Sequence, residues 1–317
     1  MRILHLDENH PLLIERLANA GFHNITAYKD PIAEIESMLA LIDGLVLRSR
    51  IPIDRSLLSQ CKALKFVARV GAGLENIDQD QLNTLGIKLF SAPMGNANAV
   101  GEHALGMLLN LTNKLRAAHQ SIANGDWKRE HHRGDELEGK TVGIIGYGNM
   151  GQSFAQKLKG FAIKEVIFYD IVRKKPDGWA RQVSLEEVQE NADIISLHTP
   201  ETPLTIGMID LPFIEKMKKP FWLINTARGS AIKTSAVVNA MRTQKIKGVA
   251  LDVFEYEERS FEQLIQGKTP RDLQHLLLAD NAILSPHVAG WSVESHQKLA
   301  TIIADQIIEN FGSNLLP

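Results

Sequence analysis

The amino-acid sequence predicts an α/β protein with two doubly wound parallel-sheet domains, Rossmann-like and flavodoxin-like, and a cleft between them. Three observations favour this fold. The chain has 317 residues, about twice the usual size of a single hydrophobic core. Short apolar runs alternate with amphipathic stretches, which is the rhythm of β-α-β units. A long helical stretch then divides this alternation into two series.

The first series predicts a small parallel sheet covered by helices on both faces. Its strands are expected at residues 3–6, 44–47, 65–68 and 87–90. Each run is short and apolar, as strands buried on both faces are. No dinucleotide fingerprint occurs in this part of the chain.

The second series predicts a complete Rossmann sheet. A connecting helix is expected at 98–123, because leucines recur there near the helical period. Six strands are expected at 142–145, 166–169, 194–197, 222–224, 249–251 and 282–284. A final helix at 293–311 is expected to pack back on the first series. We therefore expect one domain from residues 1–97 plus 292–317 and a second from 98–291.

Composition excludes several classes of protein. The net charge of −2 argues against broad capture of nucleic acid or anionic membrane, and no apolar stretch reaches the roughly 18 residues of a membrane span. The single cysteine, Cys61, leaves no disulfide to form within the chain, and no metal site is expected from the spacing of cysteines and histidines. Residues 2–7 read as a strand rather than a signal peptide. We expect a soluble, cytoplasmic protein.

A glycine-rich turn predicts the cofactor site. The sequence GYGNMG at 146–151 follows an apolar strand and precedes a helix expected at 152–159. Gly146 permits the tight turn, Gly148 lets a pyrophosphate approach, and Gly151 lets the helix pack on the strand. Such a turn alone also occurs without a ligand. Asp170, about 20 residues further on at the end of the next strand, suits the ribose hydroxyls and favours NAD over NADP.

Three basic residues behind Asp170 keep use of both cofactors open. Arg173, Lys174 and Lys175 follow that strand end. Cations there accommodate a 2′-phosphate, whereas a solvated turn of the same composition has no such role. The sequence leaves this choice unresolved.

Three further motifs place reactive residues just past predicted strand ends. They are NTARG at 225–229, LDVFEYE at 251–257 and SPHVAGW at 285–291. Ligands bind at the carboxyl ends of strands in open α/β sheets. In this order, and with the fingerprint, the motifs resemble the D-isomer-specific 2-hydroxyacid dehydrogenase family over nearly the whole chain. The resemblance implies a substrate domain (1–97 plus 292–317) and an NAD-binding domain (98–291).

The resemblance assigns the catalytic roles. Arg228 matches the family's substrate-binding arginine, His287 its acid/base and Glu257 the carboxylate partner of that histidine. A planar guanidinium holds a carboxylate by two parallel hydrogen bonds. An imidazole that is paired with a carboxylate holds its proton more readily near neutral pH. Singly, each residue is as easily structural.

The same resemblance implies a set of cofactor contacts. Asp252 is expected near the nicotinamide carboxamide, although an aspartate after a strand is also a common turn residue. Residues 198–200 match the loop at the cofactor's edge. The full expected set is Gly146, Gly148, Asn149, Met150, Gly151, Asp170, His198, Thr199, Pro200, Thr226, Ala227, Asp252 and Gly290.

Residues 67–78 resemble the family's substrate loop, whose backbone amides bind a carboxylate. Arg48, Arg50 and Arg69 look like the phosphoglycerate dehydrogenase branch of the family, and three arginines suit a phosphate. Scattered surface arginines are the alternative. The expected substrate contacts are Arg48, Arg50, Arg69, Val70, Gly71, Ala72, Gly73 and Asn96.

The sequence thus predicts an NAD-dependent enzyme that oxidises 3-phospho-D-glycerate to 3-phosphohydroxypyruvate in serine biosynthesis. A glyoxylate/hydroxypyruvate or D-lactate reductase is the alternative enzyme, and an NAD-sensing binding protein or corepressor is the alternative of another class. By family analogy we expect a homodimer through the cofactor domain. The chain ends at Pro317, so no C-terminal regulatory domain is expected.

The segment after Glu257 departs from the family pattern. Glu258 stands where a proline is expected, and the stretch to Leu284 is longer than usual. A helix is expected at 260–266 in this insertion.

Overall fold

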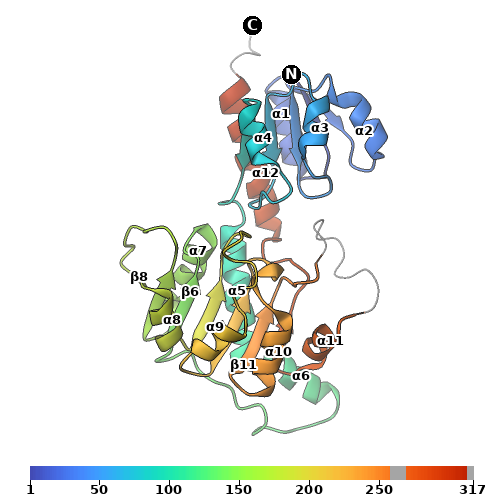
Figure 1. Ribbon diagram of the computed structural model, residues 1–317. Helices are drawn as coiled ribbons and strands as arrows, with labels where there is room; N and C mark the ends of the chain where they lie inside the picture. Colours follow the sequence, from blue (N-terminus) through green and yellow to red (C-terminus); the bar gives the residue numbers. More distant parts are fainter. Residues whose placement is uncertain (258–268, 313–317) are drawn as a thin grey trace. The chain divides into compact units, whose positions relative to one another are not determined.

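Two parallel β-sheets organise the chain, one in each of two compact units (Figure 1). The computed structural model describes residues 1–257 and 269–312. Within these residues, the first unit comprises 1–96 and 291–312, and the second comprises 97–257 and 269–290. The helix that the sequence predicts at 260–266 lies outside the described residues. The predicted fold class, a pair of parallel α/β sheets, is confirmed.

The first sheet has five strands among the described residues, in the order β2-β1-β3-β4-β5, and all its pairings are parallel. This is the flavodoxin-like order. Four of these strands match the predicted runs to within two residues, whereas β2 was not predicted. It lies at the sheet edge and its sequence, HNIT, contains a single aliphatic residue. The strands are β1 (Arg2–His5), β2 (His23–Thr26), β3 (Gly44–Leu47), β4 (Phe66–Arg69) and β5 (Lys88–Ser91).

Helices cover both faces of the first sheet. On one face lie α1 (Pro11–Asn19) and α12 (Val293–Phe311), whose apolar side chains pack against β1, β3 and β4. The other face is covered by α2 (Ile32–Leu39), α3 (Arg55–Gln60) and α4 (Gln79–Thr84). The last helix therefore completes the core of a unit that the chain began at its N-terminus.

The second sheet has seven parallel strands in the described chain, in the order β12-β11-β10-β9-β6-β7-β8. The six predicted strands are all present, and the short edge strand β8, with the sequence ARQ, was missed. Strand β6 lies between β7 and β9, so the strand order reverses there, and ligands bind at such a switch point. The strands are β6 (Thr141–Ile145), β7 (Glu165–Tyr169), β8 (Ala180–Gln182), β9 (Ile194–Leu197), β10 (Phe221–Asn225), β11 (Ile246–Leu251) and β12 (Ala282–Leu284).

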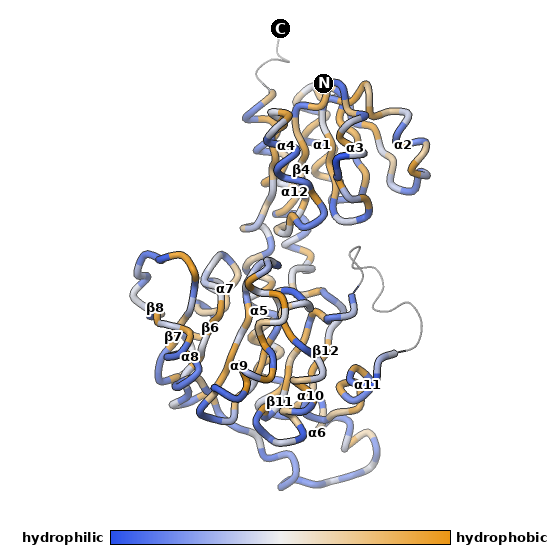
Figure 2. The backbone as a smooth tube through the Cα atoms, viewed as in Figure 1, coloured by the Kyte–Doolittle hydropathy of each residue, from blue (hydrophilic) through white to orange (hydrophobic). Residues whose placement is uncertain are grey.

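One face of the second sheet is covered by α5 (Ala97–Thr112) and α7 (Asn149–Lys157). The other face is covered by α8 (Leu185–Asn191), α9 (Leu211–Lys216), α10 (Thr234–Arg242) and α11 (Arg271–Leu278). The strands between these layers run mostly orange, and hence apolar, in Figure 2.

The prediction of a single helix at 98–123 was wrong, because the structure has two helices there. Lys114 adopts a left-handed backbone with φ of 54° and separates α5 from α6 (Leu115–Ala123). The side chain of Asn110 accepts a hydrogen bond from Arg116 N at 2.9 Å and so caps the new start. The periodic leucines predicted the helical content but carried no signal for this turn.

Candidate active site

The glycine turn after β6 is shaped by two close backbone approaches. Gly146 has φ of +88°, and a Cβ atom there would lie 2.7 Å from the carbonyl oxygen of His198. A Cβ on Gly151 would lie 2.2 Å from the carbonyl oxygen of Gly146. Side chains are excluded at both positions, so α7 begins directly against the end of β6. It starts at Asn149, three residues before the predicted start at 152.

The start of α7 fits the pyrophosphate of NAD. Gly148 is the N-cap residue and offers no side chain to the first amides of the helix, so the N–H groups of Asn149, Met150 and Gly151 are suited to an anion. A Cβ on Gly148 would meet nothing within 4 Å. Because no protein atom requires a glycine at this position, its small size is best explained by the approach of a ligand.

Asp170 lies beside this turn at the end of β7. Its Oδ2 accepts a hydrogen bond from Tyr147 N at 2.8 Å, and its Oδ1 accepts one from Val172 N at 2.8 Å. Lys174 Nζ lies 3.4 Å from Oδ2. The carboxylate is thus fixed next to the pyrophosphate position, where it suits the ribose hydroxyls. Lys174 neutralises part of its charge.

The loops after β9 and β10 present two buried hydroxyls. Thr199 Oγ1 and Thr226 Oγ1 are buried and have no hydrogen-bond partner within the described residues. Unpaired buried hydroxyls are costly, and a bound dinucleotide would pair them. Pro200, the third residue of the predicted loop, is exposed. The adjoining Glu201 accepts a hydrogen bond from Ser230 Oγ at 2.5 Å, which ties the two loops together.

The His198 side chain is buried, and its Nδ1 has no hydrogen-bond partner among the described residues. Its Nε2 lies 2.8 Å from Ser196 Oγ, and burial lowers the pKa of its ring to about 3. Its backbone, which approaches Gly146, is the part of this residue that borders the turn. Ala227 is buried in the turn after β10, and Gly290 follows the turn after β12. Their contacts with the cofactor remain predictions.

Arg228 stands in a turn that Asn225 holds. Asn225 Nδ2 donates to the carbonyl oxygen of Arg228 at 2.9 Å, and Asn225 Oδ1 accepts from Ala227 N at 3.0 Å. A Cβ on Gly229 would lie 1.9 Å from the carbonyl oxygen of Phe254, so this turn packs on the segment that leads to Glu257. No role was predicted for Asn225, although it ends a buried strand within the NTARG motif.

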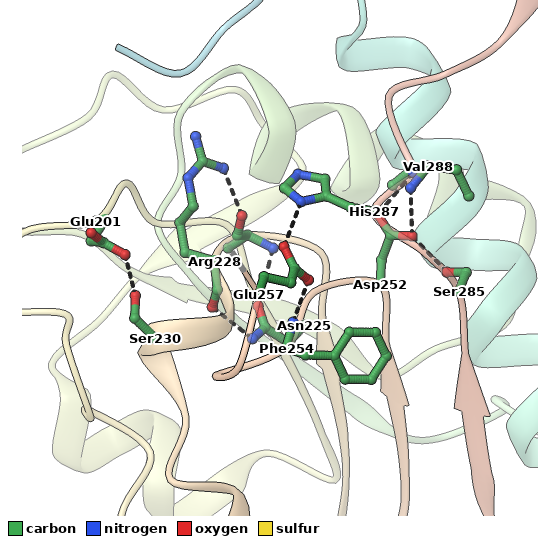
Figure 3. A network of polar contacts seen from close by, with 12 residues as sticks. Glu201, Asn225, Arg228, Ser230, Asp252, Phe254, Glu257, Ser285, His287 and Val288 are labelled. Atoms are coloured by element: carbon green, nitrogen blue, oxygen red, sulfur yellow. Dashed lines mark hydrogen bonds and ion pairs between the residues drawn. The ribbon is translucent and has the colours of Figure 1, made fainter. Parts of the chain in front are cut away.

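The structure brings Glu257 and His287 together (Figure 3). Glu257 Oε2 lies 2.8 Å from His287 Nδ1, and Glu257 Oε1 accepts a hydrogen bond from Phe254 N at 2.5 Å. The Glu257 side chain is 11% exposed and that of His287 is 27% exposed. The pair is therefore shielded but remains accessible on the histidine side, as a proton donor to a substrate must be.

Asp252, at the end of β11, holds the turn that carries His287. Its backbone carbonyl accepts from His287 N at 2.7 Å, its Oδ1 from Val288 N at 2.9 Å, and its Oδ2 from Ala289 N at 2.8 Å. Ser285 Oγ also donates to Oδ1 at 2.6 Å. The sequence predicts Asp252 at the nicotinamide and indicates no role for Ser285. The observed contacts give the carboxylate a role in the turn itself.

The predicted arginines of the first unit have different surroundings. Arg50 donates to the backbone carbonyls of Leu6, Ala27 and Asp30 at distances from 2.5 to 3.3 Å, so its guanidinium braces the ends of β1 and β2. Arg48 instead stacks its guanidinium 4.1 Å from the ring centre of Trp291. Of the two, Arg48 is the better candidate for an anion.

The predicted substrate loop has only part of its amides available. Val70 N donates to Leu47 O at 2.9 Å and Gly71 N donates to Arg69 O at 2.8 Å. The amides of Ala72 and Gly73 make none of the backbone hydrogen bonds found in the described chain. Arg69 Nη1 also donates to Val70 O at 3.0 Å.

Asn96 Oδ1 is buried with no partner among residues 1–257 and 269–312. This unpaired acceptor is compatible with the predicted contact to a substrate hydroxyl.

The described residues hold neither a candidate metal centre nor a candidate membrane span. They contain no group of three or more histidine, cysteine, aspartate or glutamate side chains placed to hold a metal ion. None of their helices has both the length and the apolarity needed to cross a bilayer.

Comparisons with known proteins agree on one family. Residues 105–289 match the NAD-binding domain of the D-isomer-specific 2-hydroxyacid dehydrogenases. The chain is 33% identical over 279 residues to a hydroxypyruvate reductase of Thermotoga maritima and covers 88% of each protein. It is 33% identical over 307 residues to a D-3-phosphoglycerate dehydrogenase of Bacillus subtilis, covering 94% of this chain but 56% of the relative.

A solved structure extends the agreement to three dimensions. The D-lactate dehydrogenase of Aquifex aeolicus, in complex with NAD and lactic acid, superposes with a TM-score of 0.83 at 26% identity, covering 100% of this chain and 97% of that one. The chain therefore belongs to the D-isomer-specific 2-hydroxyacid dehydrogenase family. It is an NAD-dependent oxidoreductase that acts on a small 2-hydroxy acid.

Proposed function

We propose that the enzyme oxidises 3-phospho-D-glycerate to 3-phosphohydroxypyruvate with NAD, the first step of serine biosynthesis. The observation that carries this proposal is the setting of Arg48. Its guanidinium stacks on Trp291, and burial lowers its pKa despite the opposing charge of Asp7. It has no ion-pair partner in the described part of the chain. A partly buried cation of this kind is stabilised by an anion, and a phosphate suits a guanidinium well.

The names of several relatives support the same substrate. Proteins of Bacillus subtilis, Haemophilus influenzae and Archaeoglobus fulgidus, 31 to 33% identical to this chain, are named D-3-phosphoglycerate dehydrogenases. The chain spans 49 to 72% of their lengths.

The proposed chemistry assigns one task each to three residues of the second unit, His287, Glu257 and Arg228. Bound NAD would accept a hydride from C2 of the hydroxy acid. His287 accepts the hydroxyl proton, and Glu257 orients the imidazole and stabilises the charge that forms on it. Arg228 binds the carboxylate and polarises the keto oxygen of the product. In the reverse direction, His287 returns the proton to that oxygen.

Reduction of hydroxypyruvate is the second candidate. The Thermotoga maritima relative of that name matches this chain over 88% of both lengths, which none of the three phosphoglycerate dehydrogenases does. In addition, the backbone carbonyls around Arg50 occupy donors that a phosphate would use. Both observations favour an uncharged group at C3 of the substrate.

Steady-state oxidation of NADH with a panel of keto acids tests the proposal. The panel contains 3-phosphohydroxypyruvate, hydroxypyruvate, glyoxylate and pyruvate. We expect the highest kcat/KM with 3-phosphohydroxypyruvate. A higher value with hydroxypyruvate would favour the second candidate, and a higher value with pyruvate or glyoxylate would reject both.

We further propose that the enzyme is a cytoplasmic homodimer that associates through the second unit. Exposed apolar side chains occur on α6 and α11, where Ile122 is 61% and Leu278 is 84% exposed. The two helices are neighbours, because Arg116 Nη2 donates to Ala279 O at 2.7 Å. Sedimentation equilibrium of the wild type and of Leu278→Asp tests this surface. We expect a dimer that the substitution weakens, and a monomeric wild type would reject the proposal.

A further inference from the structure

A chain of hydrogen bonds reaches Asp252 from helix α5. His103 Nε2 lies 2.9 Å from Ser285 Oγ, and Ser285 Oγ lies 2.6 Å from Asp252 Oδ1. His103 Nε2 is itself 3.6 Å from Asp252 Oδ1. The Asp252 carboxylate is thus a meeting point of α5, β11 and the turn after β12. Figure 3 draws the contact between Asp252 and Ser285.

The chemistry of these groups fixes the direction of the chain. The Asp252 carboxylate can only accept, so the hydroxyl hydrogen of Ser285 points to Asp252. The Ser285 oxygen is then the acceptor towards His103, and His103 must carry a hydrogen on Nε2. Ser285 therefore donates directly to the Asp252 carboxylate, whose side chain is 1% exposed, and His103 donates to Ser285. A buried charge is tolerated only when such donors satisfy it.

The buried carboxylate matters for the reaction because of the backbone of His287. This residue has φ of +54°, a strained left-handed conformation that a non-glycine residue keeps only where its surroundings enforce it. Three contacts that hold this turn come from Asp252, which accepts hydrogen bonds from the amides of His287, Val288 and Ala289, and His287 N also donates to Ser285 O at 3.1 Å. An Asp252 side chain that rotates away releases two of them.

We propose that His103 and Ser285 are positioning residues for this reaction. They hold the Asp252 carboxylate in the rotamer that keeps the turn at His287 left-handed, and so keep the imidazole against Glu257. His103 acts as a hydrogen-bond donor from Nε2. The proposal rests on the role of His287 as proton donor, which belongs to the proposed function, and it adds two residues to which the sequence assigned no role.

Two substitutions at His103 distinguish the effect of its hydrogen-bond donor from the effect of its side-chain volume. His103→Gln keeps a side-chain N–H donor in nearly the same place, whereas His103→Leu fills the space without a donor. We expect His103→Leu to lower kcat about 10-fold, with KM for NADH changed less than about 2-fold, and His103→Gln to restore kcat to within about 3-fold of the wild type. The matched controls are His23→Leu and His23→Gln at an exposed position of edge strand β2, for which no change is expected.

Ser285→Ala provides a second test of the proposal. It is expected to lower kcat as His103→Leu does, and the double variant His103→Leu/Ser285→Ala should be no slower than the worse single variant, because the two residues act in series. Additive losses would overturn the proposal, as would wild-type kcat in His103→Leu or equal kcat in His103→Leu and His103→Gln.

All variants are assayed with the keto acid that the wild type reduces best. A wild type that prefers an unphosphorylated acid would reject the proposed substrate without affecting this test. His287→Ala serves as the reference, and if it retains full activity, the proposed role of His287 fails rather than that of His103 alone.

Discussion

His287 Nδ1 and Glu257 Oε2 lie 2.8 Å apart, although 29 residues separate the two in the sequence. The carboxylate can only accept, so Nδ1 carries the hydrogen, and in the neutral ring Nε2 is the basic nitrogen. This arrangement gives the imidazole a fixed orientation and a stabilising charge. It is the geometry that a general acid and base of a dehydrogenase requires.

We predict that His287→Ala lowers kcat by about 10²- to 10⁴-fold, the usual contribution of general acid–base catalysis, while NADH still binds. Glu257→Gln keeps an acceptor for Nδ1 but removes the charge, so we expect a smaller loss. Stopped-flow turnover measures kcat, and NADH fluorescence titration measures binding. Full turnover in His287→Ala would remove this residue from the mechanism.

The setting of Asp170 predicts a change of cofactor preference. Asp170→Ser removes the charge that repels a 2′-phosphate and leaves Lys174, now without its partner at 3.4 Å, to attract it. We expect the ratio of kcat/KM for NADPH to that for NADH to rise about 10-fold or more. The double variant Asp170→Ser/Lys174→Gln is the control and should lose most of the gain. An unchanged ratio in the single variant would place the ribose elsewhere.

The two N-terminal arginines predict different outcomes when each is removed. Arg48→Ala is expected to lower kcat/KM for 3-phosphohydroxypyruvate about 10-fold more than for glyoxylate, because a phosphate gains a charge-assisted hydrogen bond that glyoxylate lacks. Arg50→Ala leaves the carbonyls of Leu6 and Ala27 without their donor. It is expected to destabilise the first unit by about 1–3 kcal/mol and to leave substrate preference unchanged.

Calorimetry and the panel of keto acids check both expectations for these arginines. Equal losses with the two acids in Arg48→Ala would reduce Arg48 to a structural residue.

Two buried histidines predict that acid weakens the fold. Burial lowers the pKa of His5 to about 4, with an opposing hydrogen bond to Asn24, and that of His198 to about 3. Their ordinary pKa is 6.5, so between pH 6.5 and about 4 the unfolded chain binds protons that the folded chain does not. The stability contributed by the neutral rings is full above pH 6.5 and is lost as the pH falls, by up to about 1.4 kcal/mol per pH unit for each ring.

Urea unfolding at pH 7.5 and pH 5.5 measures this loss through the transition midpoint. We expect His5→Gln, which keeps a donor towards Asn24, to show a smaller drop in midpoint than the wild type. The exposed His23→Gln is the control and should behave as the wild type does. A wild-type midpoint that is the same at both pH values would contradict the buried neutral state.

The sequence predicted those parts of the fold whose signal is local. Strands buried on both faces, such as Thr141–Ile145, are unbroken apolar runs, whereas the edge strands His23–Thr26 and Ala180–Gln182 are short and polar and gave no such signal. The break at Lys114 was also missed. The apolar periodicity continues through this residue, and the cap that Asn110 supplies to Arg116 N is a side-chain contact that the periodicity does not indicate.

In the candidate site, too, residues within local motifs were predicted and contacts between distant residues were not. The motif positions of Arg228, Glu257 and His287 were readable because each follows a strand end. The contact between His103 and Ser285 joins residues that are 182 positions apart, and no sequence pattern predicts it. The sequence also showed Arg50 as a cation but not the backbone carbonyls that bind it.

The most direct test of the proposed substrate compares two hydroxy acids that differ only in a phosphate. Reduction of NAD by the wild type is measured with 3-phospho-D-glycerate and with D-glycerate at equal concentrations and pH. We predict that kcat/KM is at least about 10-fold higher for the phosphorylated acid, about 1.4 kcal/mol of added transition-state binding. An equal or higher kcat/KM for D-glycerate would contradict the proposed substrate.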